Sequence, residues 1–300
     1  MNVIDSGGLT KIYGNLKALD NLSFNIEENK ITGLIGRNGS GKTTLLKLIA
    51  GFLHKTSGEL KVFSENPFNS IKVSSNMIFI DDNMSFPASL HLVDILEAAG
   101  SFYDNWDAGL ANGLFDYFGL NPRQPHSNLS KGMKSTFNMI IGLSARCPLT
   151  IFDEPTTGMD VAVRKDFYRA LLKDYLQNPR TIIISSHLLN EVEHVLEDIL
   201  LLGEGQKRIH IPVEELREFA IGLKGKTDIV QELATGKEVY HRENFGKDST
   251  YVVVKNDFSE GRLQNAKLSG IEIIPVTTDD LCVFLTSRNK GGIDDVFNRN

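Results

Sequence analysis

The chain has few cysteines, no long apolar run and no excess of basic residues. Among its 300 residues only Cys147 and Cys282 carry thiols, and their isolation argues against a disulfide framework or a thiolate metal cluster, as expected in a reducing cytosol. No stretch approaches the eighteen apolar residues of a membrane span, and the N-terminus lacks the basic start and apolar run of a signal peptide. The net charge of −6 and the pI of about 5.7 argue against a surface that binds nucleic acid.

A glycine-rich loop stands out against this background. It runs from Gly36 to Thr44 as GRNGSGKTT, after an apolar run at residues 31–35 and before a helical pattern at residues 45–50. A strand, a glycine loop and a helix in this order are the context of a phosphate-binding loop. The glycines let backbone N–H groups surround phosphate oxygens, Lys42 reaches the β- and γ-phosphates, and the Thr43 hydroxyl can ligate Mg²⁺. The loop predicts a nucleoside triphosphate site with these binding residues: Gly36, Asn38, Gly39, Ser40, Gly41, Lys42, Thr43 and Thr44.

Two adjacent carboxylates follow a second apolar run. Asp153 and Glu154 come directly after residues 149–152, which are β-branched or apolar. Because side chains alternate along a strand, we expect the two carboxylates to point to opposite faces. Asp153 is then the carboxylate on the metal side, and Glu154 is the base that orients the attacking water.

Four further motifs accompany these two. Leu129-Ser130-Lys131-Gly132-Met133 precedes a helical pattern, residues 153–160 read DEPTTGMD and end in Asp160, His187 follows two serines, and Tyr13 lies near the N-terminus. With the phosphate loop, this order resembles the nucleotide-binding subunit of an ABC transporter over about residues 3–205. The motifs are similar to its signature (usually LSGGQ), its Walker B and D-loop, its switch histidine, and the aromatic ring that stacks on adenine.

The resemblance implies a mechanism. In this family two nucleotide-binding domains close head to tail, and each ATP lies between one phosphate loop and the signature of the other subunit. Ser130 and Gly132 then contact the γ-phosphate in trans, Asp160 belongs to the ATP site, and His187 holds the γ-phosphate and positions water with Glu154. The catalytic residues are thus Glu154, His187 and Lys42, and the cofactors are ATP and Mg²⁺.

The resemblance also implies partners and a location. The expected partners are a second ABC ATPase subunit, in a homodimer or a heterodimer, and an integral-membrane permease subunit of the ABC-2 type. The protein is then cytoplasmic and peripheral on the inner face of the cell membrane.

The chain departs from the family pattern at two motifs. Asp81-Asp82 stands where the family has the glutamine of the Q-loop, after the apolar run of residues 77–80. Alignment by that run favours Asp82, whereas alignment back from Phe86-Pro87 favours Asp81, and either aspartate can ligate Mg²⁺ or its water. The signature has Lys131 and Met133 in place of Gly and Gln.

These departures, the aromatic segment at residues 102–107 and an extra C-terminal domain resemble one subgroup. It comprises the ATPases of ABC-2-type exporters of Gram-positive bacteria, including YtrB-like proteins and exporters of toxin or antimicrobial peptides. The resemblance implies export of such a peptide. The aromatic segment either lies near the groove that receives a coupling helix of the membrane subunit or is the packed core of a subdomain.

An ABC ATPase that acts on ribosomes or chromosomes, outside transport, is the alternative. Ribosomal types carry two cassettes, and the chain has one phosphate loop; chromosomal types need long heptad arms, and residues 42–153 contain none. A regulatory subunit without hydrolysis is disfavoured because Lys42, Glu154 and His187 are all present.

The apolar patterns and the resemblance together predict the fold class, an α/β P-loop NTPase. We expect a RecA-like core with a parallel sheet, an antiparallel β layer, a helical subdomain and a smaller C-terminal α+β domain. Alternation predicts a strand at residues 22–26 outside the main sheet, with residues 60–63 in the same layer. Buried strands are expected at residues 77–80, 149–152, 181–184 and 199–202, and helices within residues 87–120, 134–146, 161–176 and 188–196.

The predicted domains are residues 1–205, with the helical subdomain at about 87–146, and an accessory or regulatory domain at residues 211–300. Toward the C-terminus we expect a helix near residues 213–220 and short strands at residues 207–211, 239–242, 250–254, 271–276 and 281–285. Residues 278–285 also resemble the helix-like closing segment of many exporter ATPases, an alternative to the strand at residues 281–285. The sequence leaves open whether this domain regulates or stabilises a dimer, or is a packing module without a ligand.

Overall fold

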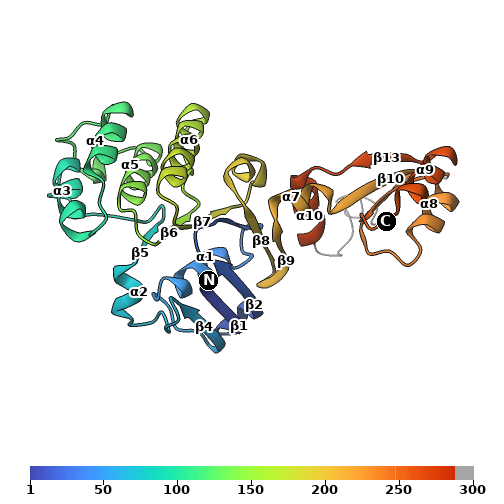
Figure 1. Cartoon of the computed structure of the whole chain (residues 1–300), viewed down its shortest axis with the longest axis horizontal. Coiled ribbons are helices and arrows are strands. Elements are labelled where there is room, and N and C mark those ends of the chain that lie inside the picture. The colour runs from blue at the N-terminus through green and yellow to red at the C-terminus, as the bar shows by residue number, and fades with distance from the viewer. Residues whose placement is uncertain (247, 288–300) are drawn as a thin grey trace, which may run out of the picture. The chain divides into compact units, whose positions relative to one another are not determined.

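The computed structural model describes residues 1–246 and 248–287 and divides into two compact units, Met1–Val213 and a unit that begins at Glu214 (Figure 1). The sequence places the domain boundary at residues 205–211. Residues 288–300 of the predicted second domain lie outside the described part.

A six-stranded sheet forms the centre of the first unit, in the order β5-β6-β7-β3-β8-β9. The first five of these strands are mutually parallel, and β9 pairs antiparallel with β8. β3 and β7 are buried at every residue, as expected for strands covered on both faces. The strands are β3 (Ile31–Ile35), β5 (Met77–Ile80), β6 (Leu149–Asp153), β7 (Thr181–Ser186), β8 (Asp198–Gly203) and β9 (Gln206–Pro212).

A separate antiparallel sheet in the order β2-β1-β4 confirms the predicted second layer. It consists of β1 (Asn2–Tyr13), β2 (Leu16–Glu27) and β4 (Ser57–Val62). Along β2 the side chains of Leu22, Phe24 and Ile26 are buried, while those between them are exposed. Helix α1 (Lys42–Ile49) shares one apolar core with both sheets, which fixes the helix that follows the phosphate loop.

The helical subdomain contains more elements than the sequence pattern separates. The predicted run at residues 87–120 is two helices, α3 (Leu92–Phe102) and α4 (Ala108–Tyr117), because the Asp107 carboxylate accepts a hydrogen bond from the Leu110 N–H at 2.8 Å and starts a new helix. Figure 1 shows α3, α4 and α5 grouped, with α6 beside α5. The remaining helices and turn are α2 (Ile71–Ser75), η1 (His126–Asn128), α5 (Lys131–Ser144) and α6 (Val161–Gln177).

The aromatic segment at residues 102–107 packs only in part. A Cβ on Gly100 would lie 3.1 Å from Cδ1 of Trp106, so the indole rests on the last turns of α3. Burial raises the pKa of Tyr103 to about 12, whereas Phe102 is 72% exposed. The side chains of Tyr103 and Trp106 are therefore partly buried, whereas that of Phe102 is exposed.

Of two predictions near β8, the helix at residues 188–196 is wrong and the strand at residues 207–211 is confirmed. Residues 188–196 form two 3₁₀ turns, η2 (Leu189–Glu191) and η3 (Glu193–Val195), instead of an amphipathic helix. The buried residues Leu189, Val192 and Val195 are spaced by three, which is the period of a 3₁₀ turn. The predicted strand at residues 207–211 is β9, which pairs antiparallel with β8 and completes the main sheet.

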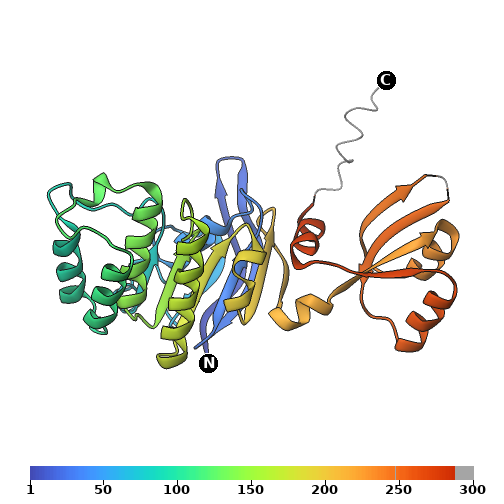
Figure 2. The ribbon, with the colours of Figure 1, turned by 90° about the horizontal axis from the view of Figure 1, so that it is seen from above.

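The second unit (orange to red in Figure 2) is a βαββαβ arrangement, with an antiparallel sheet in the order β11-β12-β10-β13. After α7 (Val213–Glu218) come β10 (Ala220–Lys226), α8 (Thr227–Ala234), β11 (Val239–Phe245), β12 (Ser249–Lys255), α9 (Glu260–Leu268), β13 (Glu272–Pro275) and α10 (Thr278–Thr286). Leu223, Val230, Val252 and Val254 belong to its core. The sequence pattern did not reveal β10, α8 or α9.

The predicted strand at residues 281–285 is helix α10. The Thr277 hydroxyl accepts a hydrogen bond from the Asp280 N–H at 3.1 Å, and Asp279 and Asp280 lie in the first turn. Both features favour a helix start, and they outweigh the strand-like run of apolar residues. Phe284 stacks on His241 of β11 with ring centroids 4.3 Å apart, so α10 packs on the sheet of its own unit.

Candidate active site

The glycine loop lies between the end of β3 and the start of α1, and its glycines allow close backbone approaches. A Cβ on Gly36 would lie 2.5 Å from the Leu202 carbonyl oxygen, and a Cβ on Gly41 would lie 2.5 Å from the Ala18 carbonyl oxygen. Gly41 also has φ 101°, in the left-handed region. The N-terminal N–H groups of α1 therefore begin at the loop, where they can face an anion.

Lys42 is held inside this loop. Its Nζ donates a hydrogen bond to the Gly36 carbonyl oxygen at 2.7 Å and lies 3.3 Å from Oε1 of Glu154. Only 6% of the side chain is exposed. Among the described residues the buried Ser40 hydroxyl has no hydrogen-bond partner, which leaves a polar atom of the loop available to a ligand.

The two carboxylates lie on one pocket, which corrects the prediction that they point to opposite faces. β6 ends at Asp153, and Glu154 adopts φ 50°, so the strand alternation does not extend to Glu154. The Ser185 hydroxyl connects the two residues, since it donates to Oδ1 of Asp153 at 2.6 Å and accepts from the Glu154 N–H at 2.9 Å. A non-glycine residue in this conformation is a strained position of the kind found at functional sites.

Burial raises the pKa of Asp153, and hydrogen bonds from Ser185 and Thr43 oppose the rise. The Thr43 and Asp153 side chains both line the same pocket. Hydroxyl and carboxylate oxygens are the donors that Mg²⁺ prefers. Among the described residues no three His, Cys, Asp or Glu side chains form a group that could hold a metal ion by themselves.

His187 follows the end of β7 and contacts Glu154. Its Nδ1 lies 2.9 Å from Oε2 of Glu154, and both side chains are partly exposed. Glu154 thus lies between Lys42 and His187, and β6 and β7 are adjacent strands. This geometry places a carboxylate, an imidazole and an ammonium group together at the carboxyl ends of the parallel strands.

A pocket of about 520 Å³ joins these groups. Tyr13 is 44% exposed, lines the pocket and has the Lys11 Nζ 4.8 Å from its ring centroid. The pocket residues that the sequence singled out are Tyr13, Asn38, Gly39, Ser40, Gly41, Lys42, Thr43, Thr44, Asp82, Asp153, Glu154 and His187. Five further residues line the pocket without having been predicted from the sequence, and of these only Thr157 lies within a recognised motif: Leu16, Lys17, Ala18, Asn83 and Thr157.

The two aspartates after β5 are in different environments. Asp82 lines the pocket, whereas Asp81 does not. The Asp81 carboxylate accepts a hydrogen bond from the Asn83 N–H at 3.1 Å, and its backbone oxygen accepts one from the Asn138 amide at 3.4 Å. The geometry therefore favours Asp82 over Asp81 for a role toward the nucleotide.

Ser130, Gly132 and Asp160 do not line the pocket of their own chain. The Ser130 hydroxyl accepts from the Met133 N–H at 3.3 Å and caps α5, which explains why α5 begins before the predicted residue 134. The Asp160 carboxylate accepts from the Val163 N–H at 2.9 Å and caps α6. A Cβ on Gly132 would lie 2.4 Å from the carbonyl oxygen of Gly158, so the start of α5 packs closely on the turn that follows Glu154.

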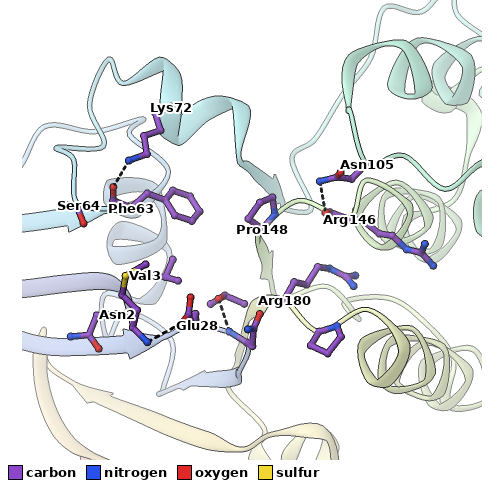
Figure 3. A pocket seen from close by; sticks show the side chains of 14 residues that line it. Asn2, Val3, Glu28, Phe63, Ser64, Lys72, Asn105, Arg146, Pro148 and Arg180 are labelled. Carbon is purple, nitrogen blue, oxygen red and sulfur yellow. Dashed lines mark hydrogen bonds and ion pairs between the residues drawn. The ribbon is translucent and has the colours of Figure 1, made fainter.

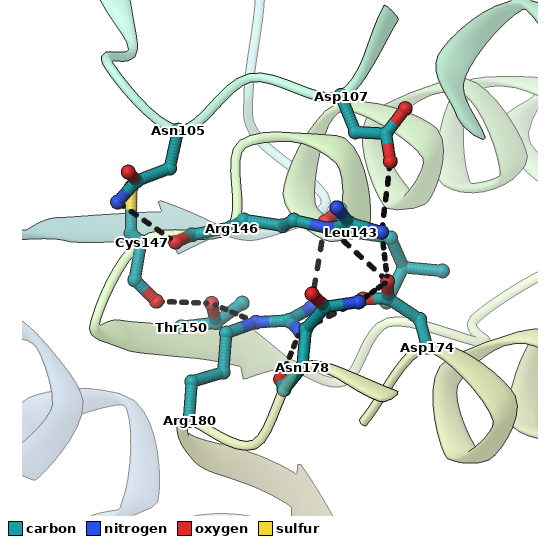
Figure 4. Close-up of polar contacts among 9 residues, drawn as sticks. All are labelled: Asn105, Asp107, Leu143, Arg146, Cys147, Thr150, Asp174, Asn178 and Arg180. Atoms are coloured by element: carbon teal, nitrogen blue, oxygen red, sulfur yellow. Dashed lines mark hydrogen bonds and ion pairs between the residues drawn. The ribbon is translucent and has the colours of Figure 1, made fainter. Parts of the chain in front are cut away.

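A buried ionic network supports β6 and β7 at their opposite ends (Figure 4). The Asp174 carboxylate contacts Nη2 of Arg146 at 2.8 Å and Nη1 of Arg180 at 2.7 Å, and Arg146 also contacts Asp107 at 2.8 Å. A pocket of about 470 Å³ lies beside it (Figure 3). Since the buried Arg180 guanidinium is hydrogen-bonded to Asp174, Thr150 and backbone oxygens, this network is structural. Nothing in the local sequence pattern indicated it.

Comparison with known proteins agrees with this geometry. The ABC transporter family model matches residues 19–157. The bacitracin transport ATP-binding protein BcrA of Bacillus licheniformis is 27% identical over 93% of this chain and 94% of its own length. The lantibiotic transport ATP-binding protein SrtF of Streptococcus pyogenes is 30% identical over 66% of this chain and 86% of its own length.

Solved structures show the same fold. An ATP-binding subunit of an ABC transporter superposes with a TM-score of 0.64 and 21% identity, covering 72% of this chain and 92% of that one. A dimeric ATP-binding cassette in a post-hydrolysis state bound to ADP and phosphate superposes with a TM-score of 0.60 and 20% identity, covering 70% and 98%. Among the described residues no helix is long and apolar enough to cross a bilayer. The chain belongs to the ABC transporter family, in which it is an ATP-binding subunit with ATPase activity.

Proposed function

We propose that the chain hydrolyses ATP at a site completed by a second subunit and thereby drives a membrane permease. The observation that carries the proposal is the contact of Glu154 with both Lys42 and His187 inside the pocket. The substrate phosphates meet the glycine loop and Lys42, and Tyr13 at the pocket edge stacks on the adenine. Asn38, Ser40 and Thr44 belong to the same binding surface.

Different residues of the chain have different roles in ATP hydrolysis. Glu154 accepts the proton of the attacking water, and the partner charge of Lys42 keeps the Glu154 carboxylate directed into the pocket. The Nδ1 atom of His187 lies 2.9 Å from the Glu154 carboxylate. The imidazole donates a hydrogen bond toward the γ-phosphate and, together with Glu154, positions the attacking water. Thr43, Asp153 and Asp82 are the residues that would hold Mg²⁺, which supplies charge neutralisation at the phosphates.

A second subunit completes the site. Ser130 and Gly132 lie outside the pocket of their own chain, yet they sit at the N-terminus of α5, whose unpaired N–H groups attract an anion. We infer that they contact the γ-phosphate of ATP bound by the partner, with Asp160 nearby at the start of α6. Since one chain carries both halves of a site, a homodimer is chemically sufficient, and a heterodimer with a second ATPase is the other arrangement.

The names of the relatives support a proposal for the partner and the cargo. Two relatives are named for bacitracin and lantibiotic transport, and we infer that this chain works with an ABC-2-type permease that exports a peptide antibiotic or toxin. The chain itself is then cytoplasmic and bound to the inner face of the membrane through the permease. The second unit is an accessory domain of this subunit.

The test is a resistance assay in cells that lack the gene, complemented with the chain co-expressed with a candidate ABC-2-type permease. Wild-type chain should raise the bacitracin or lantibiotic concentration needed to inhibit growth, and the Glu154→Gln variant should not. Equal protection by both would show that hydrolysis at Glu154 is not needed. No protection against any peptide antibiotic would contradict the proposed cargo class.

A further inference from the structure

The two motifs at which the chain departs from its family pattern contact each other. Nζ of Lys131 lies 3.5 Å from Oδ2 of Asp82, with side-chain exposures of 59% and 41%. Asp82 follows β5 of the central sheet, and Lys131 is the first residue of α5. The contact therefore joins the sheet core to the helix that carries the signature.

Asp82 brings a charge to a pocket built for phosphates. The pocket is lined by three carboxylates (Asp82, Asp153 and Glu154) and two lysines (Lys17 and Lys42). The family pattern has a neutral glutamine at this place, so Asp82 adds one negative charge where a polyanionic substrate binds. Lys131 lies outside the pocket lining and adds the opposite charge next to it.

The aliphatic stem of Lys131 packs against the backbone at Gly158. A Cβ on Gly158, which has φ 81°, would lie 3.1 Å from Cγ of Lys131, so the stem runs along the turn after Glu154. Asn83 donates a hydrogen bond to the other carboxylate oxygen of Asp82 at 3.0 Å. Each oxygen of Asp82 therefore has a partner, and the carboxylate is held from the signature side and from its own loop.

We propose that Lys131 is a positioning residue for ATP binding. Its ion pair cancels the charge of Asp82 at the phosphate pocket, so that the charged pair replaces the neutral Gln and Gly of the family pattern. The inference rests on the proposed function, because it requires that ATP binds at this pocket.

The test is a double-mutant cycle in the full-length chain, with ATP titrated into the purified protein in EDTA and in Mg²⁺. Lys131→Gln leaves Asp82 uncompensated and should weaken ATP binding by about 1.5-fold to fivefold, the range expected for a partly exposed pair. Lys131→Arg should retain the wild-type affinity. In EDTA, where no Mg²⁺ ligand is needed, the double variant Asp82→Asn/Lys131→Gln should regain the wild-type affinity, because the pair is neutral again. Raising the salt concentration should reduce the defect of Lys131→Gln, since the repulsion is screened.

The matched control is Lys134→Gln, which removes a lysine from the same helix outside the pocket lining and should leave ATP affinity unchanged. Equal affinity of Lys131→Gln and wild type would overturn the inference, and so would a double variant that binds ATP no better than Lys131→Gln in EDTA. If the proposed function itself were wrong, the wild-type protein would not bind ATP, and this result distinguishes the two failures.

Discussion

Removing the Ser185 hydroxyl should damage both stability and metal dependence. In the structure this fully buried hydroxyl donates to Asp153 and accepts from the Glu154 N–H. Ser185→Ala therefore loses one hydrogen bond to a carboxylate and one between neutral groups, and leaves a buried polar group on each side. Bonds to charged groups contribute about 1.5–3 kcal/mol and neutral ones about 1 kcal/mol, so the expected loss is roughly 2–4 kcal/mol.

Unfolding of the unit that contains the ATP site can be followed by tryptophan fluorescence. Trp106 is the only tryptophan of the chain and belongs to the first unit, so its fluorescence in a denaturant titration reports on that unit. The variant should also need more Mg²⁺ for half-maximal ATPase activity, because the Ser185 hydrogen bond lowers the pKa of Asp153 and its loss favours the protonated carboxyl.

Ser144→Ala is the matched control for this experiment. The Ser144 hydroxyl is fully buried and has no hydrogen-bond partner among the described residues, so its removal should change stability by less than about 1 kcal/mol in either direction. Equal unfolding midpoints and equal Mg²⁺ requirements for Ser185→Ala and Ser144→Ala would refute the role given to Ser185.

Three further results are expected. Glu154→Gln should lower ATP hydrolysis at least about 100-fold and trap an ATP-bound dimer, seen by light scattering after size-exclusion chromatography; wild-type turnover would make another residue the base. Gly132→Ala forces the start of α5 away from Gly158 and should cost about 1–3 kcal/mol in a melting assay; an unchanged melt would contradict the close packing. Burial lowers the pKa of His126 below 6.5, so the unfolded chain binds the proton first and stability is lost as pH falls below about 6.5. His126→Gln should flatten that loss below about pH 6.5, and an equally steep loss would refute this.

Much of the first unit could be predicted because its signals are local. Short stretches of sequence predict three of its features without any distant contact. The glycines indicate the phosphate loop, the alternation at residues 22–26 indicates a half-buried strand, and the apolar runs of β6 and β7 indicate fully buried strands. Motif order then places the carboxylates and His187 at the ends of adjacent strands. These predictions needed no knowledge of distant contacts.

The remaining features depend on contacts that a local pattern does not contain. The positive φ of Glu154 turns its carboxylate into the same pocket as Asp153, which strand alternation alone cannot predict. The choice of Asp82 over Asp81 depends on where the loop after β5 meets α5. Helix α10 carries a strand-like apolar run, and only its capping residues, Thr277 with Asp280, indicate a helix.

The most direct test of the account is ATP titration of the Lys42→Ala variant, with Lys47→Ala on the same helix as the control. Lys42 lines the pocket and Lys47, in the last turn of α1, does not. The account predicts that Lys42→Ala loses tight ATP binding while Lys47→Ala keeps the wild-type affinity. ATP affinity unchanged in Lys42→Ala would contradict the assignment of this loop as the site of the triphosphate.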